Sequence, residues 1–245
     1  MIAPPTRQQA LATLTAELSA FQRLVATLND EDWSRPTASA GWTVRDLVAH
    51  VAGQFEEQAR FGTFRRRLRE AKRRYPDRIA LDAHNQFQID ELAGRPTAEL
   101  TAHLARHVPL ALRAIRRAPG LVRRLPSTIF FPEPPLPDRR MSYLFDILTS
   151  RDTWMHRLEI ADATGRPFTV DDHDTAVVEQ VLRDLARAWT GPDIRLELTG
   201  AITGEWTLGG NGKPVSVDGL VLMRHLSGRG GLEPDHPLSD ARVVF

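Results

Sequence analysis

Apolar residues recur at intervals of three and four along the first two thirds of the chain, and this spacing constrains the fold most strongly. The first run follows Thr6 and Gln9, which have the spacing of a helix-capping box. Its apolar positions are Leu11, Leu14, Leu18, Phe21, Val25 and Leu28. Further helical runs cover residues 43–76, 81–92, 97–115 and 142–164. Successive amphipathic helices bury their apolar stripes against one another, so the sequence predicts a helical bundle.

Prolines interrupt this helical pattern in two places. Pro109 lies inside the run that begins at Thr97, and we expect a kink there because a proline within a helix removes a backbone hydrogen bond. Residues 119–137 contain six prolines, which neither a helix nor a central strand tolerates. We therefore expect a long irregular loop in this segment, and such loops in compact domains are often functional lids.

The pattern changes after residue 166, where a helical run over residues 172–189 is followed by short β-rich segments. These segments are IRLELT, EWTL and PVSV, and we expect a short helix near Leu220 and a final strand, ARVVF, after them. The segment GGNGKP (209–214) falls between two of the strands and is interpreted as a hairpin turn.

At 245 residues and 42% hydrophobic content, the chain is long enough for two domains. We expect an α+β protein in which a four-helix bundle spans residues 1–166 and a small α/β domain spans residues 170–245.

No cysteine occurs in the chain, which excludes disulfides, a thiolate nucleophile and cysteine-ligated metals. Any metal must then bind His, Asp or Glu, and any thiol reaction needs a thiol cofactor. The 32 basic and 31 acidic residues nearly cancel, so we expect no nucleic-acid or membrane partner. The basic run Arg60–Arg78 is interpreted as a solvated helix face. MIAPPTRQQ lacks a signal-peptide pattern, and we expect a cytoplasmic protein.

Three residues form a candidate metal site. Asp152 and His156 are four residues apart in a helical run, which places them on one face about one turn apart. Such a pair is more often found on a helix surface, and a lone histidine is more often a core residue. His50, however, lies among core positions of another helix. Two ligands from one helix and one from another suit a three-ligand site with open positions.

Other polar residues compete for or could support this site. Glu159 lies near the inward face of the same helix and either orients His156 or replaces Asp152 as a ligand. His103 and His107 are also four residues apart, but no third partner is recognisable for them in the sequence. We interpret these two as histidines at the boundary of the core.

The segments GWTVRDLVAHVAG (41–53) and RDTWMHRLEIADATGRP (151–167) closely resemble the mycothiol-dependent maleylpyruvate isomerase family. That family is similar to the wider DinB-like and YfiT-like metal-binding bundles, in which one helix gives a histidine and the last gives two ligands four residues apart. The resemblance carries over to His50, Asp152 and His156. It departs from the family at Asp152, where a longer glutamate is familiar.

The segment DGLVLMRHLSGRG (218–230) resembles the family's small C-terminal domain of sterol-carrier-like shape. The resemblance implies two cofactors, mycothiol and a divalent metal, with zinc as the first candidate. A metal lowers the pKa of a bound thiol, and we expect isomerisation or thiol transfer on a small electrophilic, carboxylate-bearing substrate. Arg229 and then Arg224 are the candidates to hold that carboxylate, and Asn85 is a candidate polar contact in the cofactor pocket. The alternative is a non-catalytic metal-binding or regulatory module of the same fold.

Overall fold

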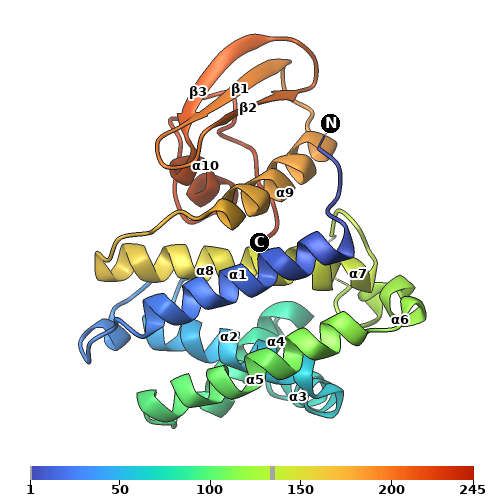
Figure 1. The fold of residues 1–245 in the computed structure, drawn as a ribbon, viewed down its shortest axis with the longest axis vertical. Coiled ribbons are helices and arrows are strands. Elements are labelled where there is room, and N and C mark those ends of the chain that lie inside the picture. Colours follow the sequence, from blue (N-terminus) through green and yellow to red (C-terminus); the bar gives the residue numbers. More distant parts are fainter. Residues whose placement is uncertain (1, 133–135) are drawn as a thin grey trace. The chain divides into compact units, whose positions relative to one another are not determined.

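The computed structural model describes residues 2–132 and 136–245. The chain divides into two compact units, one of Arg7–Pro167 and one of Phe168–Phe245 with the few residues before Arg7. The first unit is helical, and the second contains a small three-stranded sheet (Figure 1). The predicted α+β class is confirmed. No helix within the described ranges is both long and apolar enough to cross a membrane.

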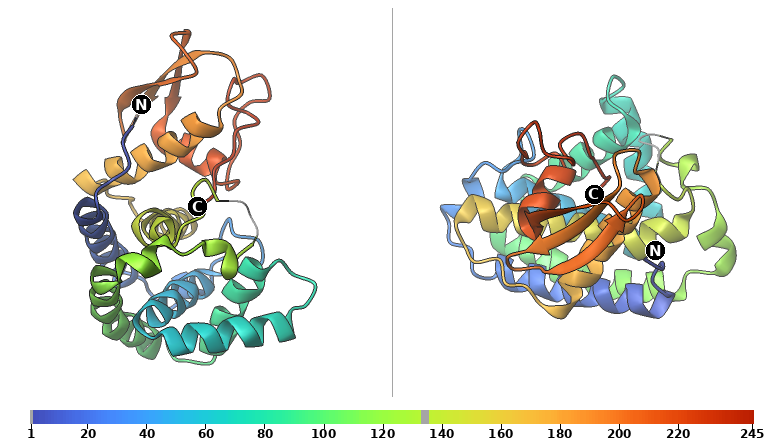
Figure 2. Two further views of the ribbon diagram at one scale, coloured as in Figure 1. Left: turned by 90° about the vertical axis from the view of Figure 1, so that its right-hand side faces the viewer. Right: turned by 90° about the horizontal axis from the view of Figure 1, so that it is seen from above.

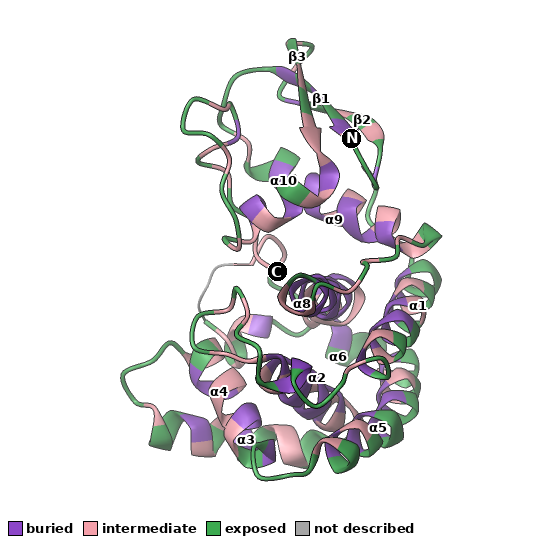
Figure 3. Ribbon diagram, turned by 90° about the vertical axis from the view of Figure 1, so that its left-hand side faces the viewer, coloured by how far each residue is buried: buried purple, intermediate pink, exposed green. Residues whose placement is uncertain are grey.

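Four long helices supply most of the core of the helical unit: α1 (Arg7–Val25), α2 (Val44–Ala59), α5 (Thr97–Arg117) and α8 (Thr149–Thr164). Helix α2 packs along α5, and α1 packs along α8. Figure 3 shows α2 buried along most of its length, whereas α1 and α5 each carry an exposed face. The apolar stripes therefore meet in one core, which includes Leu14, Leu18, Phe21, Leu100 and Leu104.

Two further helices, α3 (Phe61–Arg74) and α4 (Ala80–Leu92), pack against each other and against α2 (Figure 2). The sequence predicts one helix from Thr43 towards Pro76, but the helix breaks at Arg60, whose backbone is not helical. Helix α4 comes close to α2 at Gly53, where a Cβ atom would lie 2.9 Å from Cβ of Gln88. The absence of a side chain at Gly53 thus allows the two helices to approach.

The basic run on α3 is exposed as expected, with one exception. Arg67 is buried, with only 1% of its surface exposed. Its guanidinium contacts the carboxylates of Glu56, Glu57 and Glu91 at 2.5, 3.2 and 2.5 Å. A solvated helix face is therefore the correct interpretation for the run except at this residue, which lies inside a polar network.

The sequence predicts an irregular loop over the whole proline-rich segment, but parts of the segment have regular structure. It contains a short helix, α6 (Gly120–Arg124), and a 3-10 turn, η2 (Ser127–Ile129), while residues 133–135 lie outside the described residues. Prolines 119 and 126 stand just before these two turns, where a missing N–H costs no helical hydrogen bond. Helix α5 continues through Pro109 to Arg117.

A wide turn precedes α8. The chain forms α7 (Met141–Tyr143) and then a π-helical segment, η3 (Leu144–Leu148), before α8 begins. The Thr149 hydroxyl donates to the carbonyl of Leu144 at 2.8 Å across this turn. The sequence predicts a uniform α-helix here, and π-helical turns of this kind often occur next to functional sites.

The second unit contains α9 (Asp172–Ala188), β1 (Ile194–Thr199), β2 (Gly204–Leu208), β3 (Lys213–Asp218) and α10 (Gly219–Leu226). Strand β1 lies in the centre of the sheet, antiparallel to β2 and parallel to β3. Leu196, for example, pairs with Trp206 on one side and Val215 on the other. Alternate β1 residues are buried, and α9 and α10 contact the edge strands.

Two predictions for this unit are wrong. The segment GGNGKP is not a hairpin turn, because β2 and β3 lie on opposite sides of β1 and do not pair. ARVVF is not a strand: residues 241–245 have no regular structure, although the Val243 N–H donates to the Leu226 carbonyl at 2.9 Å. Both errors concern which segments pair in the sheet, which the local sequence pattern does not reveal.

Candidate metal centre

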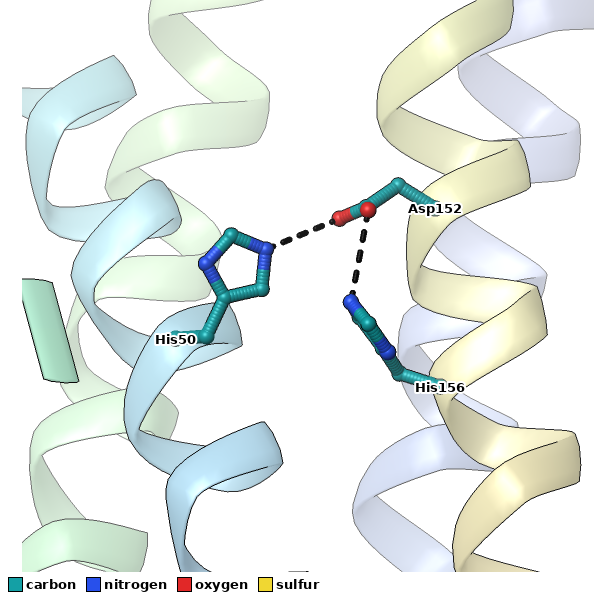
Figure 4. A group of neighbouring side chains, drawn as sticks. All are labelled: His50, Asp152 and His156. Carbon is teal, nitrogen blue, oxygen red and sulfur yellow. Dashed lines mark hydrogen bonds and ion pairs between the residues drawn. The ribbon is translucent and has the colours of Figure 1, made fainter. Parts of the chain in front are cut away.

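Helices α2 and α8 bring together the three predicted metal ligands, as Figure 4 shows. Nε2 of His50 lies 3.3 Å from Oδ2 of Asp152, and Nε2 of His156 lies 3.3 Å from Oδ1 of the same carboxylate. One potential ligand atom of each residue lies within 4.8 Å of the others. The three donors therefore converge on one point between the helices.

The spacing of these donors suits a metal ion better than it suits hydrogen bonds. A charge-assisted hydrogen bond between nitrogen and oxygen is about 2.7–2.9 Å long, shorter than either contact with Asp152. Ligand atoms bound to one tetrahedral zinc ion at about 2.1 Å are separated from one another by about 3.4 Å. Two imidazoles and one carboxylate are also a donor set that zinc accepts, so the residues fit a divalent ion.

Burial shapes the electrostatics of the cluster. His50 and His156 are buried, whereas 16% of the Asp152 side chain is exposed. Burial alone would raise the pKa of the Asp152 carboxyl, but the charges and hydrogen bonds of His156 and His50 outweigh it and hold the pKa well below its usual range. Burial lowers the pKa of His156, but Asp152 and Glu159 more than reverse this effect and raise it to about 9. His156 is thus protonated at neutral pH before a metal binds.

In both histidines, the ring nitrogen that does not face Asp152 contacts another side chain. Nδ1 of His50 donates to Oε1 of Gln88 at 2.8 Å, and the amide group of Gln88 donates to Glu57 at 2.8 Å. Because a carboxylate can only accept, this second bond fixes which end of the amide faces His50. The remaining nitrogen of His50, Nε2, is then directed at Asp152, in the arrangement common for metal-binding histidines.

Glu159 has the same relation to His156. Its Oε2 lies 2.7 Å from Nδ1 of His156, and its Oε1 accepts a hydrogen bond of 2.8 Å from the hydroxyl of Ser39. The carboxylate of Glu159 therefore contacts the nitrogen that faces away from Asp152. This position favours the orienting role over the alternative in which Glu159 replaces Asp152 as a ligand.

Helix α4 carries both Gln88, which contacts His50, and Asn85, the predicted polar contact in the cofactor pocket. Asn85 is partly exposed on α4, and within the described residues it makes no hydrogen bond to the cluster. Gln88 lies about one turn further along that helix and contacts His50 directly. The signal that could have found it is Gly53, one turn after His50, since a glycine at that position permits another helix to approach.

Two glutamines on α2 extend the site towards the start of α8. The amide of Gln54 donates to Asp152 at 3.2 Å, and the amide of Gln58 donates to the Thr149 hydroxyl at 3.0 Å. The carboxylate of Asp152 can only accept, and Thr149 already uses its own proton on Leu144, so both glutamines must present nitrogen to these partners. Oε1 of each glutamine is buried without a hydrogen-bond partner in the described part of the chain. Two acceptors next to the cluster thus remain available.

The remaining predicted residues lie in the second unit. Arg224 is on α10 and Arg229 follows that helix, and both are partly exposed. Nη1 of Arg229 donates to the carbonyl of Ser227 at 3.3 Å. In the helical unit, Trp42, which the sequence analysis does not assign to the site, lies with its ring centre 5.5 Å from that of His50 and 6.1 Å from that of His156.

Comparison with known proteins places this chain in a family. Residues 14–161, more than half of the chain, match the family described as the mycothiol maleylpyruvate isomerase N-terminal domain. No protein of curated function matches the sequence. Two solved structures are similar, the mycothiol-dependent maleylpyruvate isomerase and a histidine-to-alanine mutant of it. Each is 16% identical with a TM-score of 0.61, over 92% of this chain and 90% of that chain.

At that identity the two structures show a shared fold. The match of residues 14–161 is the stronger result, because it includes His50, Asp152 and His156, the whole of the first segment that carries the resemblance and most of the second. The resemblance predicted from the sequence is confirmed, and the chain belongs to the family of the mycothiol maleylpyruvate isomerase N-terminal domain.

Proposed function

We propose that this protein is a mycothiol-dependent metalloenzyme of the maleylpyruvate isomerase type. A divalent ion, with zinc as the first candidate, binds to His50, Asp152 and His156. The enzyme catalyses isomerisation or thiol transfer on a small electrophile. Family membership supports this proposal. The observation that carries it is the spacing of the three donors, because each histidine nitrogen lies 3.3 Å from the Asp152 carboxylate. The other ring nitrogen of each histidine contacts a second side chain, Gln88 or Glu159.

A divalent ion in this cluster supplies one kind of chemistry, stabilisation of the thiolate form of a thiol bound to it. The thiol must come from a cofactor, because the chain has no cysteine. Gln88 and Glu159 keep the two imidazoles oriented, so little reorganisation is needed when the ion binds. With a divalent ion bound, the single negative charge of Asp152 would leave the three-ligand centre with a net positive charge, which would favour an anionic sulfur.

Gln54 and Gln58 are the residues that we assign to binding the rest of the cofactor. Their buried Oε1 atoms can accept hydrogen bonds from hydroxyl or amide groups of a polar thiol. Trp42 lies beside both histidine rings and would exclude water from the metal-facing side. The substrate carboxylate remains assigned to Arg229, with Arg224 second, because a guanidinium can bind a carboxylate through two parallel hydrogen bonds.

Cobalt-substituted protein tests the role of the thiol. Adding mycothiol near neutral pH should produce a sulfur-to-metal charge-transfer band, and His50→Ala should abolish it. Gln54→Ala should keep the band for a small thiol such as mercaptoethanol but weaken mycothiol binding. Arg229→Ala should spare the band and raise KM for a carboxylate substrate only.

Two results would reject parts of this proposal. If no thiol, mycothiol included, perturbs the cobalt spectrum, the assignment of thiol activation fails. If mycothiol binds the metal but no electrophile is turned over, the non-catalytic module of the same fold becomes the better description.

A further inference from the structure

A second cluster of potential metal ligands lies between α2 and α5, and the proposed function does not use it. Glu56 from α2 and His103 and His107 from α5 each offer one ligand atom within 4.8 Å of the other two. The sequence shows the two histidines four residues apart but gives no third partner for them. The packing of α2 along α5 supplies that partner, Glu56.

The contact between Glu56 and His103 has the length expected around a metal ion. Nε2 of His103 lies 3.2 Å from Oε2 of Glu56, whereas the hydrogen bond from Arg67 to the same oxygen measures 2.5 Å. Two ligand atoms of one tetrahedral ion lie about 3.4 Å apart. The imidazole rings of His103 and His107 have their centres 4.3 Å apart, so both can face a common point.

His107 presents an unused nitrogen in the protein interior. Only 2% of the residue is exposed, and its Nδ1 donates to the backbone carbonyl of His103 at 2.9 Å. Nε2 is therefore the nitrogen with the lone pair in the neutral ring, and it is buried without a hydrogen-bond partner in the described part of the chain.

The surrounding charges favour a cation. The buried guanidinium of Arg67 contacts three carboxylates, those of Glu56, Glu57 and Glu91, and Arg66 contacts Glu91 at 2.6 Å. Two arginines thus face three carboxylates, one of which, Glu57, also lies 2.7 Å from Nε2 of His84.

We propose that Glu56, His103 and His107 form a second metal site that binds a divalent ion of the zinc class. The donor set of two imidazoles and one carboxylate is the same as in the first cluster, but it joins α2 to α5 instead of α2 to α8. An ion at this site cross-links two helices of the bundle. The site needs neither a thiol nor a substrate, so it can be tested independently of the proposed function.

Calorimetric titration of the chelator-treated, full-length protein with Co²⁺ or Zn²⁺ tests the second site. The wild-type protein should bind two ions per chain, and His156→Ala should retain one of them. In that background, His107→Gln should weaken the remaining binding by about 100-fold or more, because it removes one of three ligands. His236→Ala, which changes a histidine outside both clusters, is the matched control: it should leave the remaining ion bound in the His156→Ala background and both ions bound in the otherwise wild-type protein.

Binding of no ion by the His156→Ala protein would overturn the proposal, as would His107→Gln retaining wild-type affinity in that background. Anomalous diffraction from crystals of the wild-type protein soaked in Co²⁺ gives a result that does not depend on folding of the variants. A peak between Glu56, His103 and His107 is expected. Its absence at a cobalt concentration that fills the first cluster would reject the second site.

Discussion

Metal binding at the first cluster should release a proton from His156. The test is to titrate the metal-free protein with Co²⁺ at a series of pH values. The protein carries His107→Gln, which disables the second cluster. The pKa of His156 is raised to about 9, so pH 7 lies two units below the midpoint of its titration. A metal that binds at pH 7 must therefore displace the proton on His156. This competition corresponds to about 100-fold in apparent affinity, or about 2.7 kcal/mol.

Apparent affinity for Co²⁺ should therefore rise about tenfold per pH unit between pH 7 and about 8.5, and should level off above pH 9. Calorimetry in buffers with different ionisation enthalpies gives the number of protons released, which should be close to one at pH 7. Glu159→Gln removes one of the two carboxylates that hold this proton, so it should reduce the pH dependence. A pH-independent affinity with no proton released would refute the assigned protonation state of His156.

Three further predictions concern stability and the residues that support the first cluster. The folded-state pKa of His156 lies above its unfolded value, so protonation of His156 stabilises the folded protein. This contribution is full below about pH 6.5 and is lost as pH rises through about 9. The Tm of the metal-free protein should therefore fall over that range, and should fall less in His156→Gln. Gln88→Ala should weaken metal binding at the first cluster by about 10–100-fold in a calorimetric titration, with Asn85→Ala as the control that leaves it unchanged. Gly53→Ala would place its Cβ atom 2.9 Å from that of Gln88, and chemical denaturation should show a loss of about 1–3 kcal/mol. An unchanged free energy of unfolding for Gly53→Ala would mean that α4 moves away at no cost.

The features predicted correctly from the sequence are those that depend on neighbours along the chain. The apolar stripe of α1 and the spacing of Asp152 and His156 follow from helical geometry alone, and His50 was identified from its core neighbours and from the family segment around it. The start of α2 was also predictable, because Thr43 and Asp46 form a capping box that is visible in the sequence.

The features that the sequence did not predict depend on which distant segments meet. Gln88 reaches His50 only because α4 comes close to α2 at Gly53, and Glu56 meets His103 only through the packing of α2 against α5. The order of the sheet follows the same rule, since local β propensity does not reveal that β3 pairs in parallel with β1. The buried position of Arg67 could not be foreseen within a run of basic residues, because its three carboxylate partners come from two other helices.

If the two clusters bind metal, the polar interior of the helical unit would make the lifetime of the protein depend on the supply of the ion. Carboxylates, imidazoles and a guanidinium occupy space between α2, α4 and α5 that hydrophobic side chains would otherwise fill, and buried ion pairs contribute little net stability. A ligand that binds only the folded state stabilises it by about 4 kcal/mol when its concentration is 1,000 times its Kd. If the two clusters bind metal, cells starved of the ion should therefore degrade this protein faster, so that its abundance as well as its activity follows metal availability.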